Sequence, residues 1–546
     1  MKEYIVQVSD PAVWDTLHSE IISSGGGTYV PNRAVLCINE RPFNDYLAHY
    51  ELTDAEAQLL EQDPRVLMVE LQADLRPGVE KSFQGARPTY TYDKSTTTTA
   101  NMKNWGLLRG TNPTNVFGAN TSASGSFTYN LDGTGVDIIV VDTGVEPGHP
   151  EFAVNADGSG GSRVVDFNWY NLGVPGIYDS ATYGGYIGDG DGHGSNCASI
   201  AAGNTCGWAS GAAIYSIRIF AGTRIYGTAT SLSAINSDVC FDLVRAFHLA
   251  KKAAAISNNV TEFSANYSVS LGHPIDATSL YYQLKAAGNT NGHVRPTICT
   301  NSWGYRSGYP TFSYANYRGS QIAITSYTQG AAYGMVNYQH PYSQVSYLDQ
   351  SANNCGAAGV IMLGAAGNYY HKIDNPTGQD YNNYYYNGFS NIYYHRGQSP
   401  TAASTFITVG AIDNSTAREQ KPYFSESGPR VDVYAPGVMI MGAYANKPYQ
   451  TAAVADPRAA GYYLNKISGT SQATPQVTGM LACVLQARPT MTGEEARQFV
   501  ATHSVKGALS FVGTDNYSNQ NSLQGSANRI LQSPFTSPGR GDITVS

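Results

Sequence analysis

The first 80 residues alternate between short segments typical of strands and segments with helical periodicity. A strand half-covered by a core alternates apolar and polar positions, whereas a surface helix repeats its apolar positions every three or four residues. The resulting βαβαβ order predicts a small ferredoxin-like α+β unit over residues 1–80. Its expected strands are Tyr4–Val8, Ala34–Ile38 and Val66–Leu71; one helix opens at Pro11 with Val13, Trp14, Leu17 and Ile21 on its apolar face, and another begins at a capping box of Thr53 and Glu56.

Residues 81–104 have a different character. They are polar, include four consecutive threonines and show no apolar periodicity. This composition predicts an exposed linker between two domains, although an ordinary surface loop within one domain has the same composition.

From about residue 105 onward, near-continuous apolar runs alternate with helical patterns. Such runs are typical of strands buried on both faces of a parallel sheet. We therefore predict an α/β domain over residues 105–505, with a mostly parallel sheet and helices on both of its faces. Its expected strands are Val136–Val141, Ile214–Phe220, Ile298–Thr300, Val360–Leu363 and Phe406–Val409, and one expected helix carries Leu232, Ile235, Val239 and Leu243 on one face.

Three tracts rich in Tyr, Ser, Asn and Gly interrupt this pattern, near residues 256–296, 305–345 and 369–398. They predict surface insertions that could contact assembly partners. Residues 506–546 are polar with weak structural signals, which predicts a C-terminal tail.

Composition narrows the functional classes. Only 14% of the 546 residues are charged, the net charge is −8, and there are 40 tyrosines and 57 glycines. The average globular protein has roughly 25% charged residues, so this chain is more typical of a secreted, extracellular protein or of a component of a large particle such as a virion. The acidic balance, without a basic stripe, argues against binding nucleic acid.

Targeting and cysteine patterns add little. No run of 18 apolar residues predicts a membrane span, and the segment MKEYIVQVSD lacks the apolar stretch of a secretory signal peptide. Seven scattered cysteines without a CxxC pair predict neither a disulfide framework nor a zinc site.

Four polar residues stand at positions where an α/β sheet assembles sites, each with a plain structural alternative. Asp142 directly follows a predicted buried strand, but an aspartate there often only makes an Asx turn. His193 lies among glycines that would leave its imidazole accessible, as polar surface or beside Asp189 and Asp191 as part of a metal site.

The other two of these four residues lie nearer the C-terminus. Ser471 precedes a buried helix and could be an N-cap, yet a helix N-terminus also offers N–H donors that stabilise an oxyanion. Asn368 follows a buried strand, either as a turn residue or with its amide directed at a developing oxyanion.

Together, and in this order, the segments resemble the subtilisin-like serine proteases, the subtilase family. The order Asp, His, Ser is itself the known subtilisin order. The resemblance covers about residues 105–500. The matching motifs are DTGV (142–145) with HPEF (149–152), DGHGSNCA (191–198), NSWG (301–304), AAGN (365–368), TVGAID (408–413), FSESGP (424–429), APG (435–437) and SGTSQATP (468–475).

The resemblance implies a role for each matching residue. Ser471 would attack the peptide carbonyl, His193 would act as general base and then general acid, and Asp142 would orient the imidazole. Asn368 and the Ser471 backbone N–H would hold the oxyanion. The walls of the primary specificity pocket would be Ser302, Trp303 and Gly304 on one side and Ala365, Ala366 and Gly367 on the other.

The resemblance also implies features outside the catalytic set. Residues 1–80 resemble the family's inhibitor-like prodomain, which would be a partner of the protease within the same chain and would be released by cleavage in the linker. The chemistry requires no cofactor, and structural calcium is common in the family, but no ligands are identifiable here. Gln472 and Gln476 replace the family's usual Met and His without altering the residues that transfer protons.

The sequence thus predicts a serine endopeptidase that acts on polypeptides and is made as a zymogen. Two alternatives remain: a non-catalytic structural or binding protein on the same scaffold, and a protease carried on a particle such as a virion.

Overall fold

The computed structural model describes residues 1–23, 27–39, 47–72, 79–83, 104–113, 131–155, 157–165, 188–221, 232–233, 237–256, 289–290, 293–307, 314–324, 327–335, 342–386, 388, 390–414, 419–444, 453–511 and 520–534. Most of the predicted linker, most of the 256–296 insertion and the end of the predicted tail lie outside these residues.

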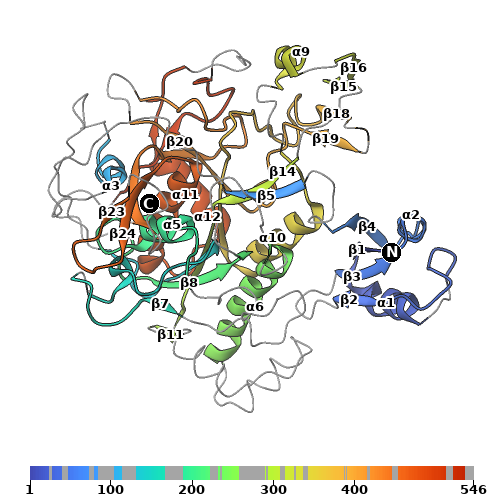
Figure 1. Ribbon diagram of the computed structural model, residues 1–546, viewed down its shortest axis with the longest axis horizontal. Coiled ribbons are helices and arrows are strands. Elements are labelled where there is room, and N and C mark those ends of the chain that lie inside the picture. The colour runs from blue at the N-terminus through green and yellow to red at the C-terminus, as the bar shows by residue number, and fades with distance from the viewer. Residues whose placement is uncertain are drawn as a thin grey trace.

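A nine-stranded sheet forms the centre of the main body (Figure 1). Its strand order is β25-β26-β21-β20-β17-β13-β6-β8-β7, and every neighbouring pair is parallel except β25–β26. All five predicted strands are found in it, within a few residues of their expected bounds. The strands are β6 (Asp137–Asp142), β7 (Val164–Val165), β8 (Ala213–Arg218), β13 (Thr297–Asn301), β17 (Ile361–Ala365), β20 (Ile407–Ile412), β21 (Val433–Pro436), β25 (Val505–Lys506) and β26 (Arg529–Ile530).

Helices cover both faces of this sheet, as predicted. Alternate strand residues point to opposite faces, so Ile139 and Val141 pack against one helical layer while Ile138 and Val140 pack against the other. The first layer contains α6 (Ser237–Ile256) and α10 (Ser346–Ala358). The second contains α5 (His193–Ala202), α11 (Thr470–Ala487) and α12 (Gly493–His503).

One predicted helix begins later than its sequence pattern suggests. Leu232 belongs to the short strand β10 (Leu232–Ser233), which pairs with β9 (Phe220–Ala221), and α6 starts at Ser237. Val239 and Leu243 are buried on α6 as expected, while Ile235 is outside the described residues. The pairing of β10 with β9 therefore determines the structure here, although the apolar spacing of a helix continues upstream of α6.

The predicted boundary of the main domain at residue 505 is too early. β26 adds to the central sheet beside β21, and Leu523, Ile530 and Leu531 are buried. These apolar residues are too widely spaced to produce a periodic signal, so the sequence pattern suggested a tail. The main body continues at least to residue 534, the last one described.

The N-terminal unit has one strand more than predicted. Its order is βαββαβ, with sheet order β2-β3-β1-β4 and antiparallel neighbours, which is the ferredoxin-like arrangement. The capping box of Thr53 and Glu56 is present, and Trp14, Leu17 and Ile21 are buried. The elements are β1 (Lys2–Val8), α1 (Trp14–Ile22), β2 (Cys37–Asn39), β3 (Leu47–Leu52), α2 (Asp54–Leu60) and β4 (Val66–Leu71).

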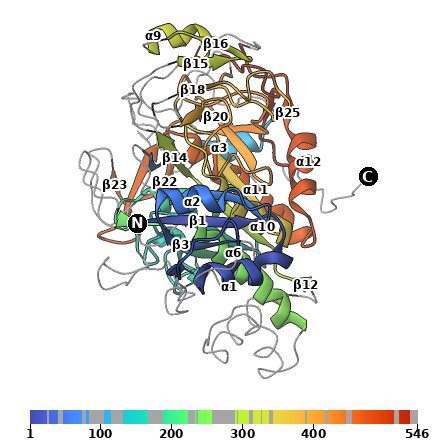
Figure 2. The same cartoon turned by 90° about the vertical axis from the view of Figure 1, so that its right-hand side faces the viewer.

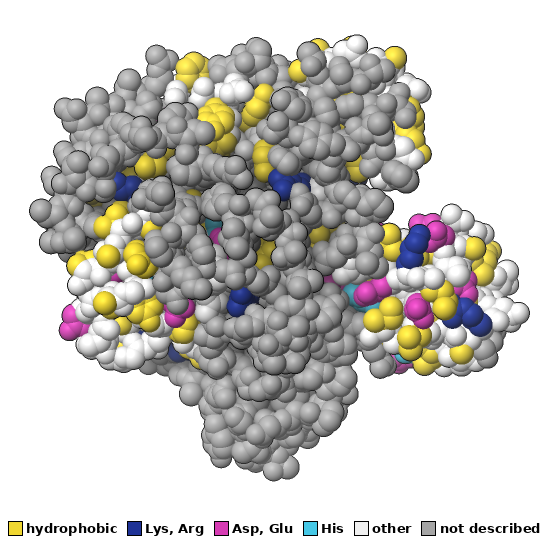
Figure 3. Space-filling model, viewed as in Figure 1, with side chains coloured by type: hydrophobic (Ala, Val, Ile, Leu, Met, Phe, Trp, Pro, Cys, Tyr) yellow, Lys and Arg dark blue, Asp and Glu magenta, His cyan; other side chains and the backbone are white. Residues whose placement is uncertain are grey.

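The additional strand β3 is buried on both of its faces, because the sheet packs against the main body. Ile5 and Leu47 join the core formed by α6 and α10. His49 is fully buried there, with Nδ1 2.5 Å from Glu3 Oε1 and Nε2 3.0 Å from Asp238 Oδ2 on α6. In the space-filling view the unit protrudes from the main body as a separate lobe (Figure 3).

The second and third predicted insertions form one substructure instead of two. β15 and β16 come from the second insertion, β18 and β19 from the third, and they pair as an antiparallel sheet in the order β16-β15-β18-β19 (Figure 2). Their bounds are β15 (Tyr314–Tyr317), β16 (Ser320–Ile322), β18 (Tyr384–Tyr386) and β19 (Asn391–Tyr393). The small core beneath them comprises Ala315, Ile324, Met335, Tyr385, Ile392 and Tyr394.

All seven cysteines fall in described segments, and none of them is in a disulfide; six are buried, and Cys37 is half-buried. No helix in the described part of the chain is long and apolar enough to cross a membrane.

Candidate active site

Asp142 ends β6 at the carboxyl edge of the central sheet, where α/β folds assemble their sites. Its carboxylate is almost fully buried. Oδ1 accepts hydrogen bonds from the backbone N–H of Thr143 at 2.7 Å and from His193 Nδ1 at 2.8 Å. Because the carboxylate accepts at Nδ1, the His193 proton is fixed on that nitrogen and Nε2 is left as the basic position.

His193 is the first residue of α5, and the loop before it is built around Asp189. Gly192 adopts a φ of 96°, a left-handed conformation that favours glycine. Asp189 Oδ1 accepts from Thr143 Oγ1 and Gly192 N, and Oδ2 accepts from Ser195 N, each at 2.8 Å. Asp189 therefore holds the histidine loop by hydrogen bonds, and among the described residues it does not form a group with His193 and Asp191 that is close enough to share a metal ion.

Ser471 lies in the first turn of α11, which Cys197 joins to the histidine helix α5. Pro475 stands four residues later inside α11, and it has no N–H to give to the Ser471 carbonyl. That carbonyl instead accepts from Ser302 Oγ at 3.1 Å and Cys197 Sγ at 3.4 Å. The Ser471 hydroxyl donates to the Ser302 carbonyl at 3.2 Å.

Burial and neighbouring charge act in opposite directions on the pKa of His193. Burial alone would lower that pKa, but attraction to the Asp142 carboxylate outweighs it, so the pKa of His193 is raised well above its usual value. Burial raises the pKa of the Cys197 thiol, whose Sγ lies 3.9 Å from His193 Nδ1. Asp142 therefore stabilises the imidazolium that forms when His193 accepts a proton at Nε2.

Asn368 is held by the residue that precedes the serine. Its Oδ1 accepts from Thr470 N at 2.9 Å and from Thr470 Oγ1 at 3.1 Å. Thr470 Oγ1 also accepts from the backbone N–H of Gly367 at 3.1 Å. These bonds fix the plane of the amide and turn its Nδ2 away from Thr470.

The residues expected to line the specificity pocket end two adjacent strands. Ser302 directly follows β13, and Ala365 ends β17 and is followed by Ala366 and Gly367. Trp303 was also expected to line the pocket, but its side chain is buried in the core, where its ring stacks on Phe241 with the centroids 6.2 Å apart. Only the backbone of Trp303 is therefore left for the predicted pocket wall.

A glutamine that the sequence did not single out lies between these two walls. Gln398 is fully buried, and its Nε2 donates to the carbonyl of Ala365 at 3.1 Å. A Cβ placed on Gly304 would lie 2.4 Å from Gln398 Cδ. Gln398 therefore packs between the Gly304 wall and the Ala365 wall.

A strand from the N-terminal side of the chain pairs with the first wall. β5 (Val79–Phe83) runs antiparallel to β14 (Trp303–Ser307), with Phe83 opposite Trp303, Gly304 opposite Ser82 and Val79 opposite Ser307. Residues 81–83, assigned to the linker from sequence, are thus part of a strand. The register brings the chain, at Phe83, to within one position of Ser302, whose carbonyl contacts Ser471.

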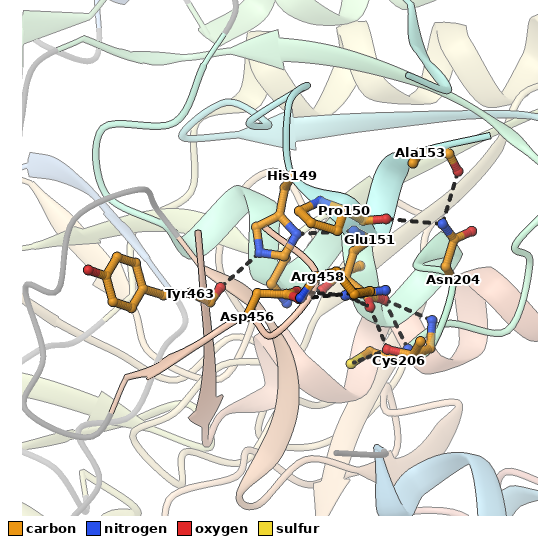
Figure 4. A network of polar contacts seen from close by, with 12 residues as sticks. His149, Pro150, Glu151, Ala153, Asn204, Cys206, Asp456, Arg458 and Tyr463 are labelled. Atoms are coloured by element: carbon orange, nitrogen blue, oxygen red, sulfur yellow. Dashed lines mark hydrogen bonds and ion pairs between the residues drawn. The ribbon is translucent and has the colours of Figure 1, made fainter. Parts of the chain in front are cut away.

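A buried ion network holds the loop after Asp142 in place (Figure 4). Glu151 accepts from Arg458 Nη2 and Thr205 Oγ1, both at 2.5 Å, and from the N–H groups of Thr205 and Cys206 at 3.0 Å. His149 Nε2 lies 2.8 Å from the Tyr463 carbonyl. The network joins the HPEF segment to the end of α5 and to the hairpin that contains Arg458, so β6 and α5 are braced behind the Asp142–His193 pair.

Comparison with known proteins agrees with this geometry. A sequence model of the Subtilase family matches residues 133–527. The chain belongs to the subtilase family. It is a subtilisin-like serine peptidase, and the matched region contains Asp142, His193, Asn368 and Ser471.

Individual subtilases are similar to this chain over different lengths. The extracellular serine proteinase of Thermus sp. (strain Rt41A) is 25% identical over 485 residues, covering 89% of this chain and 75% of the relative. The subtilisin-like serine protease Pen ch 18 of Penicillium rubens is 31% identical over 168 residues, covering 31% of this chain and 26% of the relative. Fervidolysin from Fervidobacterium pennivorans, a keratinolytic enzyme related to subtilisin, shares the fold with a TM-score of 0.50 at 16% identity, over 96% of this chain and 60% of its own.

Several residues at this subtilase site were missed in the sequence. Thr470 lies inside the SGTSQATP motif without a feature that marks it, and Gln398 lies in a tyrosine-rich tract without a distinctive signal. Within the described residues, the only group of three or more His, Cys, Asp or Glu side chains close enough to share an ion is Asp142, His193 and Cys197. Calcium binding therefore stays a prediction without a ligand set.

Proposed function

We propose that this subtilase is a serine endopeptidase that cleaves polypeptides through an acyl-enzyme, with Ser471 as nucleophile. The observation that carries the proposal is that Cys197 Sγ contacts both His193 Nδ1, at 3.9 Å, and the Ser471 carbonyl, at 3.4 Å, which brings the first turn of α11 to the Asp142–His193 pair. A nucleophile, a base and a group that orients the base are the arrangement that acyl transfer requires.

The first chemical step needs a change of hydrogen bond at the serine. The Ser471 hydroxyl, which donates to the Ser302 carbonyl at rest, turns to His193 Nε2 when a peptide carbonyl is in place. His193 takes the proton as Oγ bonds to the carbonyl carbon, and Asp142 stabilises the imidazolium. His193 then gives that proton to the departing amine, and water repeats the sequence to release the acyl group.

The negative charge on the carbonyl oxygen needs donors that are already oriented. Asn368 Nδ2 and the Ser471 N–H serve this role, because Thr470 fixes the Asn368 amide and Ser471 lies at the positive end of α11. A donor of this kind typically contributes about 10²–10³ in turnover.

Active-site labelling tests the assignment of the nucleophile. We expect an aryl sulfonyl fluoride to inactivate the enzyme and to modify Ser471 alone, because only the serine beside His193 is activated. Peptide mapping by mass spectrometry locates the label, with the Ser302→Ala variant as a check that the neighbouring hydroxyl is not the reactive one. Inactivation with the label on another residue, or with no label at Ser471, would contradict the assignment.

We further propose that residues 1–80 act as a prodomain and that the enzyme is made as a zymogen. Three observations support this: the unit has its own hydrophobic core, its sheet docks on α6 and α10, and β5 runs on directly to the site. An extended segment added to a strand of the cleft is the binding mode expected of a peptide substrate.

The proposal predicts where the chain cuts itself. Because Phe83 pairs with Trp303 and each strand residue advances about 3.3 Å, the peptide bond presented to Ser471 lies within about three residues after Phe83. Wild-type protein should therefore yield a new N-terminus there, while Ser471→Ala protein should stay full length. N-terminal sequencing and intact mass decide the matter, and active enzyme that still begins at Met1 would refute the prodomain role.

The proposal extends to location. One similar protein is named as an extracellular proteinase, which supports export of this enzyme, whereas none of the relatives named above supports transport on a virion. Its partners would be a polypeptide substrate and its own N-terminal unit.

A further inference from the structure

A tyrosine from the second insertion reaches the loop that carries Asn368. Tyr342 is 1% exposed, and its hydroxyl accepts a hydrogen bond from the backbone N–H of Asn368 at 3.0 Å. Its backbone pairs with Arg306 of β14 through an isolated bridge. Tyr342 therefore connects the strand that pairs with β5 to the backbone of the proposed oxyanion residue.

A buried carboxyl completes this contact from the opposite side. Glu426, in the FSESGP motif, is fully buried; its Oε1 accepts from the Tyr342 hydroxyl at 2.8 Å and from the Tyr369 N–H at 2.8 Å. Its own N–H donates to the carbonyl of Gly367 at 3.0 Å. One glutamate thus bonds the residues on both sides of Asn368, and its tyrosine partner bonds Asn368 itself.

The loop between these groups packs so closely against them that its Gly367 has no room for a side chain. Gly367 has a φ of 124°, and a Cβ there would lie 1.9 Å from the Tyr342 hydroxyl and 2.8 Å from Glu426 Cγ. Burying a carboxyl is costly unless it is well hydrogen-bonded, and burial raises the pKa of Glu426 to about 8. An apolar residue would fill the same space at lower cost but could not accept the hydrogen bonds from Tyr342 and Tyr369, which points to a positioning role for the carboxyl.

We propose that Tyr342 and Glu426 are positioning residues for catalysis, which together fix the backbone of residues 367–369 so that Asn368 is aimed at the oxyanion. The proposal rests on the proposed function, in which Asn368 is an oxyanion donor. Neither residue contacts the reacting atoms. Thr470 fixes the Asn368 side chain, and the Tyr342–Glu426 pair fixes its main chain.

The decisive experiment is a double-mutant cycle between Tyr342→Phe and Asn368→Ala, with kcat and KM measured on mature enzyme with a peptide substrate. Tyr342→Phe removes one hydroxyl and keeps the ring. We expect it to lower kcat about tenfold, a part of the 10²–10³ that an oxyanion donor supplies, and to change KM less than about twofold. In the Asn368→Ala background the same change should lower kcat less than about twofold, because the group that Tyr342 positions is absent.

Substitutions of Glu426 test the positioning role independently of Tyr342. Glu426→Gln keeps the Oε1 acceptor and resembles the neutral acid, so kcat should stay within about threefold of wild type, whereas Glu426→Leu removes the acceptor and should match or exceed the loss in Tyr342→Phe. The matched control is Tyr394→Phe, which removes another buried hydroxyl, bonded to the Tyr333 carbonyl at 3.0 Å in the insertion sheet. Tyr394→Phe should leave kcat unchanged.

The outcomes separate this proposal from the proposed function. If Tyr342→Phe lowers kcat equally with and without Asn368, or leaves it unchanged, the positioning role is wrong. Equal losses in Glu426→Gln and Glu426→Leu would also overturn it. If Asn368→Ala itself leaves kcat intact, the oxyanion assignment fails first. Thermal unfolding of each variant identifies any loss of kcat that comes from misfolding. If the variants of one test misfold, the other test decides whether the positioning role is right.

Discussion

Replacing Ser471 by alanine should lower kcat for peptide hydrolysis by about 10⁶-fold, the loss measured when the nucleophile is removed from subtilisin. The reason is that the acyl-enzyme of the proposed mechanism forms on the Ser471 hydroxyl. Ser302, whose carbonyl accepts from that hydroxyl, has its own Oγ bonded to the Ser471 carbonyl. Steady-state hydrolysis of a denatured protein or a chromogenic peptide measures the effect.

The same experiment tests whether serine and histidine act as one unit. His193→Ala should cost about as much as Ser471→Ala, and the double variant should cost little more than either alone. Losses that multiply would mean that the two residues act independently. Circular dichroism should be unchanged in all three variants, and a Ser471→Ala enzyme with wild-type activity would refute the mechanism.

Replacing Lys251 by methionine should destabilise the protein by about 3–5 kcal/mol, the usual cost of removing one partner of a buried ion pair. Lys251 and Asp137 are both fully buried, with Nζ 2.6 Å from Oδ2 at the start of β6. Methionine keeps most of the side-chain volume but leaves Asp137 with only Arg295, 18% exposed, at 2.7 Å. Urea unfolding in a Ser471→Ala background, which prevents self-digestion, measures the difference.

A surface ion pair provides the control for this stability prediction. Arg497 and Glu494 lie 3.0 Å apart, but the glutamate is 61% exposed, and such pairs contribute less than about 1 kcal/mol. Glu494→Gln should therefore shift the unfolding midpoint much less than Lys251→Met. Similar shifts in both variants would mean that the Lys251–Asp137 pair is not buried as described.

The site was largely predictable because its parts are local in sequence. Each motif places its polar residue at the end of a strand or the start of a helix, and the parallel sheet brings those ends to one edge. The buried strands were predictable for the same reason, because their apolar runs are continuous.

The parts that could not be predicted depend on contacts between distant segments. Strand β3 places His49 against Asp238 of the main body. The sequence around His49 does not reveal this distant partner, so the burial of His49 could not be predicted. Glu426 looks like a surface glutamate in sequence, and only its contact with Tyr342, 84 positions away, explains its burial. Leu523 and Ile530 lie in a segment for which the sequence predicts a tail, because isolated apolar residues carry no periodicity.

The sheet made from two insertions has a consequence for how this subtilase could have acquired its extra segments. Since β15 comes from one insertion and β18 from the other, a chain with only one of them would expose an unpaired strand edge, which is prone to aggregation. Tyr342 would also be lost with the first of the two. Any graft or truncation of these loops must therefore add or remove both tracts together, because their strands pair with each other.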